Sequence, residues 1–237
     1  PLVVASAFLP DVPRLVAWAG FCVAWLVGIA LVGRLAVIHD GLPPTDSLVE
    51  RFGLFTIIVL GEVIFGVVGV LSTPDRDGLV IVTGMIALVI GFGFWWIYFD
   101  LVGRRAPRNA GGPLVTWMLS HLPITLAIAA AGAAIVSLIG PAGDDRTPAA
   151  TAWLLAGAVA LGLVSLIFTE QSLADAERLD AVYRPFRPAL ALAAAASLVT
   201  GWARPAPWLL GLVLVAILSV LWLFAARRFL RADAWIS

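Results

Sequence analysis

The sequence predicts an all-α protein, a polytopic transmembrane helix bundle with about seven spans that forms one domain over residues 1–237. Hydrophobic residues make up 62% of the chain and charged residues only 13%, whereas soluble domains hold about half and about a quarter. The apolar residues also run continuously instead of alternating, which is typical of membrane helices and not of barrel strands. A soluble globule is therefore excluded.

Seven stretches are long and apolar enough to cross ~30 Å of hydrocarbon, which takes about 20 residues. Glycine, proline and polar residues separate them, as expected for loops. There is no internal repeat and no long polar linker, so a single domain is expected. The predicted spans run from Leu15 to Ile38, Leu48 to Leu71, Leu79 to Val102, Pro113 to Ile139, Thr151 to Thr169, Phe186 to Trp202 and Trp208 to Phe229.

The arginines set the predicted orientation, because the chain has no lysine. If the loop around Arg104 is cytoplasmic, eleven arginines lie inside and four outside, as the positive-inside rule expects. The chain then starts outside and ends in the cytoplasm. Because it begins at Pro1 with no signal peptide before the first span, we expect it to be part of a longer protein. Tryptophans near the span ends, such as Trp117 and Trp202, are expected to be interfacial anchors.

Charge and motifs exclude several classes of function. Fifteen basic and fifteen acidic residues cancel, which argues against a nucleic-acid partner. With one cysteine and two histidines on unrelated stretches, no cofactor and no metal site are expected. Zinc-protease, serine-hydrolase, P-loop and dinucleotide motifs are absent, so no enzymatic activity is expected. The expected partners are the lipid bilayer and a proton or small-molecule substrate, and an oligomer is compatible with the sequence.

Glu62 is the main candidate for a functional residue, because it lies near the middle of the second span, where a carboxylate costs at least ~2.5 kcal/mol. Arg51 falls on the same helix face, about 16 Å away along the axis. Gly66 and Gly69 lie near this stripe and would let another helix approach, so we expect Glu62 to face protein. Two interpretations remain open, a protonatable site on an ion or substrate path and a neutral carboxyl that bonds another helix.

His121 is the second candidate. Pro123 deprives the carbonyl of Leu119 of its usual donor, which is expected to kink the helix beside the imidazole. The imidazole of His121 could therefore belong to the same path. A neutral histidine that only forms a hydrogen bond to a neighbouring helix remains an equal alternative.

Charged residues at the span ends complete the set of candidates. Asp100 closes the third span and is expected to pair with Arg104, four residues on, or to stand at the mouth of a path. Glu50 opens the second span, as a path residue or as an ordinary acid in the first turn of a helix. Glu170 and the charged stretch 175–180 are expected to form only a connector with a short interfacial helix.

Three segments resemble the bacterial low temperature requirement A family. They read LVERFGLFTIIVLGEV at 48–63, FWWIYFD at 94–100 and SHLPITLAI at 120–128. The first is specific and the others follow in the expected order, so that together they touch spans two to four. The resemblance implies a bacterial membrane protein with a further N-terminal half, and we expect that this chain is the C-terminal portion without it. It also implies that five residues are positions of the family pattern, namely Glu50, Arg51, Glu62, Asp100 and His121.

Three positions depart from the family pattern. Val63 stands where serine is common, Ser47 where histidine is frequent and Ala127 where glycine is frequent. The missing hydroxyl beside Glu62 argues against any mechanism that needs it as a ligand or proton relay. The family name refers to growth in the cold and implies no reaction.

These observations predict an ion- or proton-coupled transporter in the bacterial inner membrane, with Glu62 as its protonatable site. The alternative is a non-transporting scaffold or bilayer-adaptation protein that supports growth at low temperature. The alternative is favoured by the density of small residues at 127–134 and 189–196, which suits tight packing between membrane helices.

Overall fold

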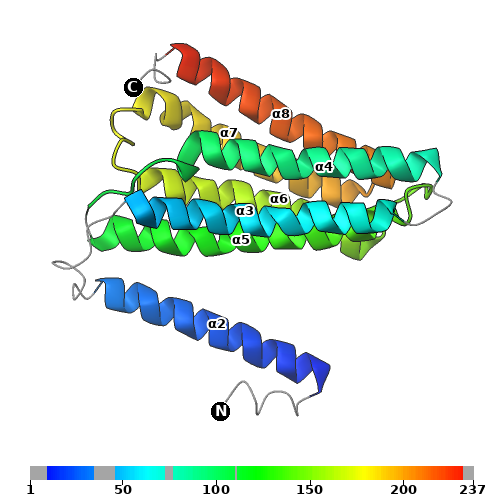
Figure 1. Cartoon of the computed structure of the whole chain (residues 1–237), viewed down its shortest axis with the longest axis horizontal. Coiled ribbons are helices and arrows are strands. Elements are labelled where there is room, and N and C mark those ends of the chain that lie inside the picture. Colours follow the sequence, from blue (N-terminus) through cyan, green and yellow to red (C-terminus); the bar gives the residue numbers. More distant parts are fainter. Residues whose placement is uncertain (1–9, 35–45, 73–76, 110, 232–237) are drawn as a thin grey trace.

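The computed structural model describes residues 10–34, 46–72, 77–109 and 111–231. These residues form seven α-helices, and one of the helices continues into a short π-helix (Figure 1). In chain order the elements are α2 (Asp11–Arg34), α3 (Asp46–Leu71), α4 (Gly78–Tyr98), the π-helix η1 (Phe99–Gly103), α5 (Gly111–Ile139), α6 (Ala149–Gln171), α7 (Asp180–Ala203) and α8 (Pro207–Arg231).

The predicted all-α bundle is confirmed. The helices α3, α5, α6, α7 and α8, together with the continuous pair α4 and η1, are each long and apolar enough to cross a membrane by length and composition. Helix α2 has 24 residues and covers most of the first predicted span. The number of spans expected from the sequence is consistent with these seven helices.

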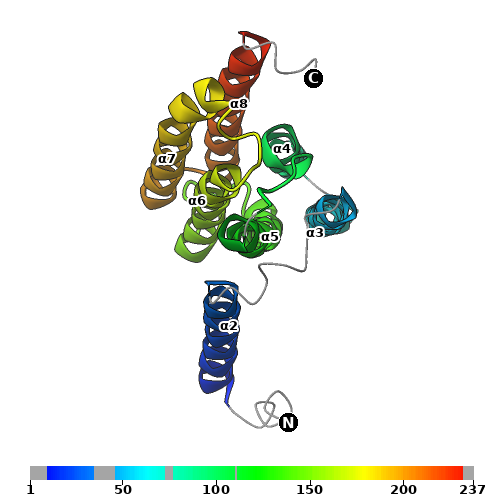
Figure 2. The ribbon, with the colours of Figure 1, turned by 90° about the vertical axis from the view of Figure 1, so that its left-hand side faces the viewer.

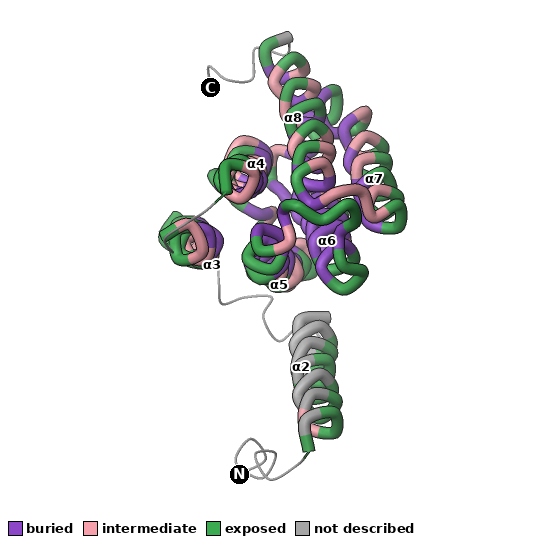
Figure 3. Tube along the Cα trace, turned by 90° about the vertical axis from the view of Figure 1, so that its right-hand side faces the viewer, coloured by how far each residue is buried: buried purple, intermediate pink, exposed green. Residues whose placement is uncertain are grey.

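Helix α6 lies at the centre of the bundle. It packs against α5 on one side and α7 on the other, and α8 packs against both α7 and α4. Figure 2 shows α3 at one edge, where it contacts α5 and α4, and α2 set apart beside α5. Buried positions are concentrated on α6 and on the surfaces that face it, whereas the outer side of α3 is exposed (Figure 3).

Small residues bring these helices into close contact. A Cβ atom added at Gly201 of α7 would lie 2.5 Å from the Cβ of Ala156 and 3.1 Å from the backbone oxygen of Ala152. One added at Gly66 of α3 would lie 2.7 Å from a methyl group of Val136. The expectation that Gly66 permits close helix approach is therefore confirmed, with α5 as the neighbouring helix.

The loop between η1 and α5 is joined to the connection between α6 and α7. Both lie at the end of the bundle where α3, α5 and α7 begin, and we call this the arginine-rich end. The backbone N–H of Arg108 donates to the carbonyl of Ser172 (2.9 Å), and that of Ala174 donates to Ala106 (3.0 Å). Arg105 forms an ion pair with Asp175. These bonds fix the α6–α7 connection as a series of turns, so the predicted short helix over 175–180 is wrong.

Helix α7 also begins earlier than the sequence predicts, at Asp180 and not at Phe186. Pro185 lies inside the helix and removes one backbone donor, which favours a later start. Tertiary contacts outweigh this loss, because Val182 and Tyr183 are buried and the hydroxyl of Tyr183 donates to the carbonyl of Leu101 (2.8 Å).

We predict that Gly201→Ala lowers the free energy of unfolding by about 1–3 kcal/mol, because the new methyl group forces α7 away from α6. The matched control is Gly157→Ala, in α6, where an added Cβ meets nothing within 4 Å. That change should be neutral or stabilising by up to ~1 kcal/mol, since alanine favours helix. Thermal unfolding of the purified protein in detergent measures both. Equal effects of the two substitutions would contradict the close packing.

Candidate functional site

Glu62 lies in the middle of α3, sixteen residues after its first residue and nine before its last. Its side chain is exposed, and so are the neighbouring Ile58 (68%) and Phe65 (76%). Among the described residues Glu62 forms no hydrogen bond or ion pair. Helix α3 packs on α4 and α5 through another side, which does not include Glu62. Within the described residues, the expectation that Glu62 faces another helix is therefore wrong.

Arg51 is exposed on α3 as well. The continuous helix Asp46–Leu71 includes both residues, and a spacing of eleven positions brings them to the same side, about 16 Å apart. The predicted common face is thus present. It faces outwards from the bundle, with a guanidinium toward the arginine-rich end and a carboxyl at mid-depth.

His121 is buried in α5 and uses both ring nitrogens. Its Nδ1 lies 2.7 Å from the carbonyl oxygen of Trp117 and its Nε2 lies 3.0 Å from the hydroxyl of Tyr98 on α4. A carbonyl only accepts, so Nδ1 must hold the proton and Nε2 of the neutral ring accepts from Tyr98. This hydrogen bond to a neighbouring helix matches the second of the two interpretations left open for His121.

Hydroxyl groups of α5 and α6 meet beside His121. Thr169 donates to Ser120 (2.8 Å), and Ser120 donates to the carbonyl of Trp117 (2.9 Å), which also accepts from His121. Because a backbone carbonyl has no proton to pass on, protons cannot hop through this group from one side to the other. The cluster therefore ties α4, α5 and α6 together and does not form a proton wire.

Glu170 and Arg187 form an ion pair between α6 and α7, with 2.5 Å between Nε and Oε1. The Glu170 side chain is only 3% exposed and that of Arg187 is 35% exposed. The second carboxylate oxygen, Oε2, is buried and has no hydrogen-bond partner among the described residues. The sequence had suggested only a connector at Glu170. An acid directly after one predicted span and an arginine at the start of the next were the signal for a pair.

Asp100 does not pair with Arg104. Instead, its Oδ2 accepts a hydrogen bond from the indole of Trp222 on α8 (2.9 Å). The cause is η1, in which Asp100 lies. Hydrogen bonds in a π-helix run from i to i+5, so residues four apart no longer lie directly above one another. The expected pair is therefore wrong, and Asp100 joins the end of α4 to α8.

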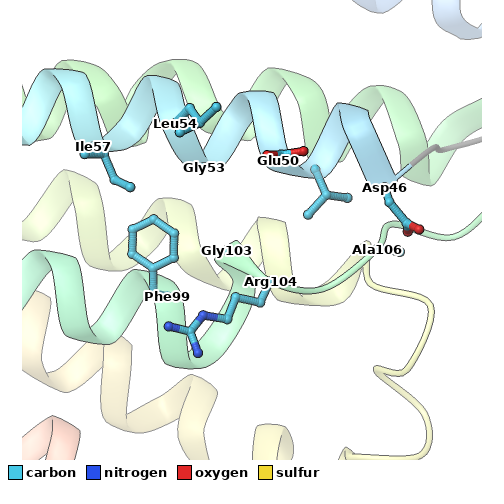
Figure 4. A pocket seen from close by; sticks show the side chains of 10 residues that line it. Asp46, Glu50, Gly53, Leu54, Ile57, Phe99, Gly103, Arg104 and Ala106 are labelled. Atoms are coloured by element: carbon cyan, nitrogen blue, oxygen red, sulfur yellow. The ribbon is translucent and has the colours of Figure 1, made fainter.

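Glu50 and Arg104 line an open pocket of about 500 Å³ between the start of α3 and η1 (Figure 4). Phe99 points across it toward Ile57 of α3. The sequence placed Glu50 and Arg104 at the ends of two spans, and the fold brings those ends together. His121 and Glu62 do not line this pocket, so the five predicted residues do not form one site.

Trp117 is fully buried, so its expected role as an interfacial anchor is wrong. Its ring centroid lies 4.4 Å from that of His121 and 4.8 Å from that of Phe52. Its indole N–H finds no partner among the described side chains and backbone. The described residues contain no group of three or more metal-ligating side chains.

We predict that Arg187→Gln destabilises the protein by about 3 kcal/mol, because it leaves the buried Glu170 carboxylate without its charged partner. The double variant with Glu170→Gln should recover much of this loss, since no buried charge remains. Arg184→Gln, an exposed position on the same helix, is the control and should change stability little. Thermal unfolding in detergent distinguishes these outcomes. A double variant no more stable than Arg187→Gln alone would refute the explanation.

We predict that Tyr98→Phe lowers the free energy of unfolding by about 1–3 kcal/mol, because the buried Nε2 of His121 then has no hydrogen-bond donor. The control is Ser137→Ala, which removes an exposed hydroxyl from α5 and should be nearly neutral. Chemical or thermal unfolding measures the difference. Similar stabilities of the two variants would show that the Tyr98–His121 hydrogen bond contributes nothing.

Comparison with known proteins identifies the family. The family model for the bacterial low temperature requirement A protein matches residues 1–225. A search of curated proteins and a search of solved structures returned no match. The match covers all the described helices except the last residues of α8, including the segments with Glu50, Glu62, Asp100 and His121. Together with six apolar helices of membrane-spanning length, it shows that this integral membrane protein belongs to the bacterial low temperature requirement A family.

Proposed function

We propose that the protein is a transporter and not an enzyme, and that it moves protons or a small solute coupled to protons or another ion across the bacterial inner membrane. The observation that carries this proposal is the place of Glu62. It is a carboxyl in the middle of an apolar membrane helix, on a face where the described residues offer it no partner. Ionisable residues at this depth are costly and are found chiefly on ion and substrate paths.

The path in this proposal follows the outer face of α3 and not the interior of the bundle. On the inner side of α3, Val63 and Val67 are 2% and 0% exposed, and Val63 packs tightly against Gly91 of α4 and Gly132 of α5. That packing leaves no room for a hydrated path. The outer face has Glu62 at mid-depth and Arg51 nearer the arginine-rich end, which on this proposal faces the cytoplasm.

His121 has a supporting role in this proposal. The ring of Phe52 contacts that of His121 with 4.7 Å between centroids, so His121 lies at the level of Phe52, about 15 Å along the axis from Glu62. Both of its nitrogens already have partners. We therefore assign the protonation step to Glu62 and a structural role to His121. The prediction that Glu50 and Asp100 also belong to a path is not part of this proposal, because Glu50 lies on the side of α3 that faces η1 and Asp100 bonds Trp222.

A second candidate function is a scaffold or bilayer-adaptation protein, and the same face of α3 favours it. Phe55, Ile58 and Phe65 are 50%, 68% and 76% exposed there. An exposed apolar face with one carboxyl suits the packing of another membrane helix, which could form a hydrogen bond with Glu62. In that case Glu62 would join two proteins and no solute would move.

The test is proton and ion flux into proteoliposomes that contain the protein with its complete native sequence. We predict that Glu62→Gln reduces flux to the level of protein-free liposomes, because the amide has nearly the same shape but cannot take up a proton. Its exposed position means that folding should be retained, which size-exclusion chromatography and thermal unfolding can verify.

The matched control is Asp144→Asn, an exposed acid in the loop between α5 and α6, which should transport as the wild type does. Unchanged flux in folded Glu62→Gln protein would overturn the proposed role of Glu62. If the wild type moves no ion at all, while Glu62→Gln disrupts a complex seen by crosslinking, the scaffold is favoured instead.

A further inference from the structure

The pocket at the arginine-rich end has an unusual combination of walls. Asp46 and Glu50 lie on the α3 side and Arg104 lies on the η1 side, while Leu54, Ile57 and Phe99 add apolar lining (Figure 4). Its volume is about 500 Å³, within the range of sites for small organic ligands. A lining of both charged and apolar groups suits an amphipathic ligand.

Two glycines form part of the wall of this pocket. The η1 segment ends at Gly103, where a Cβ atom would lie 2.6 Å from the ring of Tyr98, so a side chain has no room there. Gly53 of α3 faces this segment, and a Cβ atom added at Gly53 would lie 3.5 Å from the ring of Phe99. The two glycines therefore let α3 and η1 approach closely at this wall of the pocket.

The three charged groups of the pocket are available to a ligand. The arginines that follow Arg104 in the loop are occupied, since Arg105 pairs with Asp175 and Arg108 lies 3.5 Å from Glu177. In the described part of the chain, Asp46, Glu50 and Arg104 form no ion pair. Asp46 and Glu50 are four residues apart on one helix and so lie on the same side.

We propose that this pocket binds the headgroup of phosphatidylethanolamine. The primary ammonium group binds Asp46 and Glu50, and the phosphate binds Arg104, whose guanidinium can hold two phosphate oxygens at once. The glycerol and the start of one acyl chain lie against Leu54, Ile57 and Phe99. The pocket stands at the end of spanning helices, which is the depth at which lipid headgroups lie.

The chemistry discriminates against the other common lipid headgroups. Phosphatidylcholine has a quaternary ammonium with no N–H to donate to the two carboxylates. Phosphatidylglycerol has no cation, so it would leave the carboxylates of Asp46 and Glu50 without a counter-charge. Soluble phosphoethanolamine has both charges but no acyl chain, so it leaves the apolar part of the pocket empty. This proposal does not depend on transport, because lipid binding can be measured without any flux.

Native mass spectrometry of the full chain in detergent, with equal amounts of the three phospholipids added, tests this assignment. We expect phosphatidylethanolamine to be the preferred adduct. The double variant Asp46→Asn with Glu50→Gln should reduce its binding about tenfold, roughly the effect of losing one charge-assisted hydrogen bond, and leave phosphatidylcholine unchanged. Arg104→Gln should weaken both zwitterionic lipids alike, since both have the phosphate.

Glu177→Gln and Arg178→Gln are controls, because both residues are exposed at the same end of the bundle but lie outside the pocket. They should keep the lipid preference. Equal binding of the three lipids by the wild type, or an unchanged preference in the double variant, would overturn the proposal. Displacement of the lipid by soluble phosphoethanolamine would assign the site to the free compound and also refute it.

Leu54→Trp provides a test that keeps every charge, in case the double variant does not fold. The larger ring fills the apolar part of the pocket, and Leu54 is 52% exposed, so the helix itself should be undisturbed. We expect this variant to lose phosphatidylethanolamine binding about tenfold, the same loss as for the double variant. Binding at the wild-type level would show that the lipid lies elsewhere.

Discussion

In hydrocarbon no water is present to satisfy a polar group, so each one must find a partner within the protein. Most buried polar side chains among the described residues follow that requirement, with the indole N–H of Trp117 and Oε2 of Glu170 among the exceptions. Thr83, Ser165 and Ser197 donate to carbonyl groups one turn earlier in their own helices. Between helices, Tyr98 bonds His121 and Arg187 bonds Glu170. These few polar contacts fix the order in which α4, α5, α6 and α7 pack, which apolar contacts alone specify less sharply.

Much of the fold can be predicted from the sequence, since the length of an apolar run and the glycine, proline and polar residues that end it are local properties. The helices lie where hydropathy places them, and the family pattern in 48–63 is recognisable on residues alone. The start of α7 is harder to predict. There, the burial of Val182 and Tyr183 outweighs the local effect of Pro185, and burial depends on residues far away in the chain.

The candidate site is less predictable for the same reason. The pairing of Asp100 with Arg104 assumes regular α-helix, and the π-helical turn at 99–103 invalidates the assumed spacing. Trp117 has the position of an anchor in the sequence, but Phe52 and His121 enclose it in the fold. Side-chain direction decides both cases. Sequence periodicity shows that Glu62 and Arg51 share a face, but it cannot show whether a helix covers that face.

Helix α3 differs from the rest of the bundle in a way that bears on function. Only 22% of its most apolar window is buried, compared with 61% for the central helix α6. The two proposed sites lie on different sides of α3, with Glu50 facing η1 and Glu62 facing outwards. Since segments with few buried contacts open or move at least cost, α3 can shift at less cost than the central helix α6. A lipid headgroup between α3 and η1 would hold one end of that helix, and protonation of Glu62 would change how its outer face meets the bilayer.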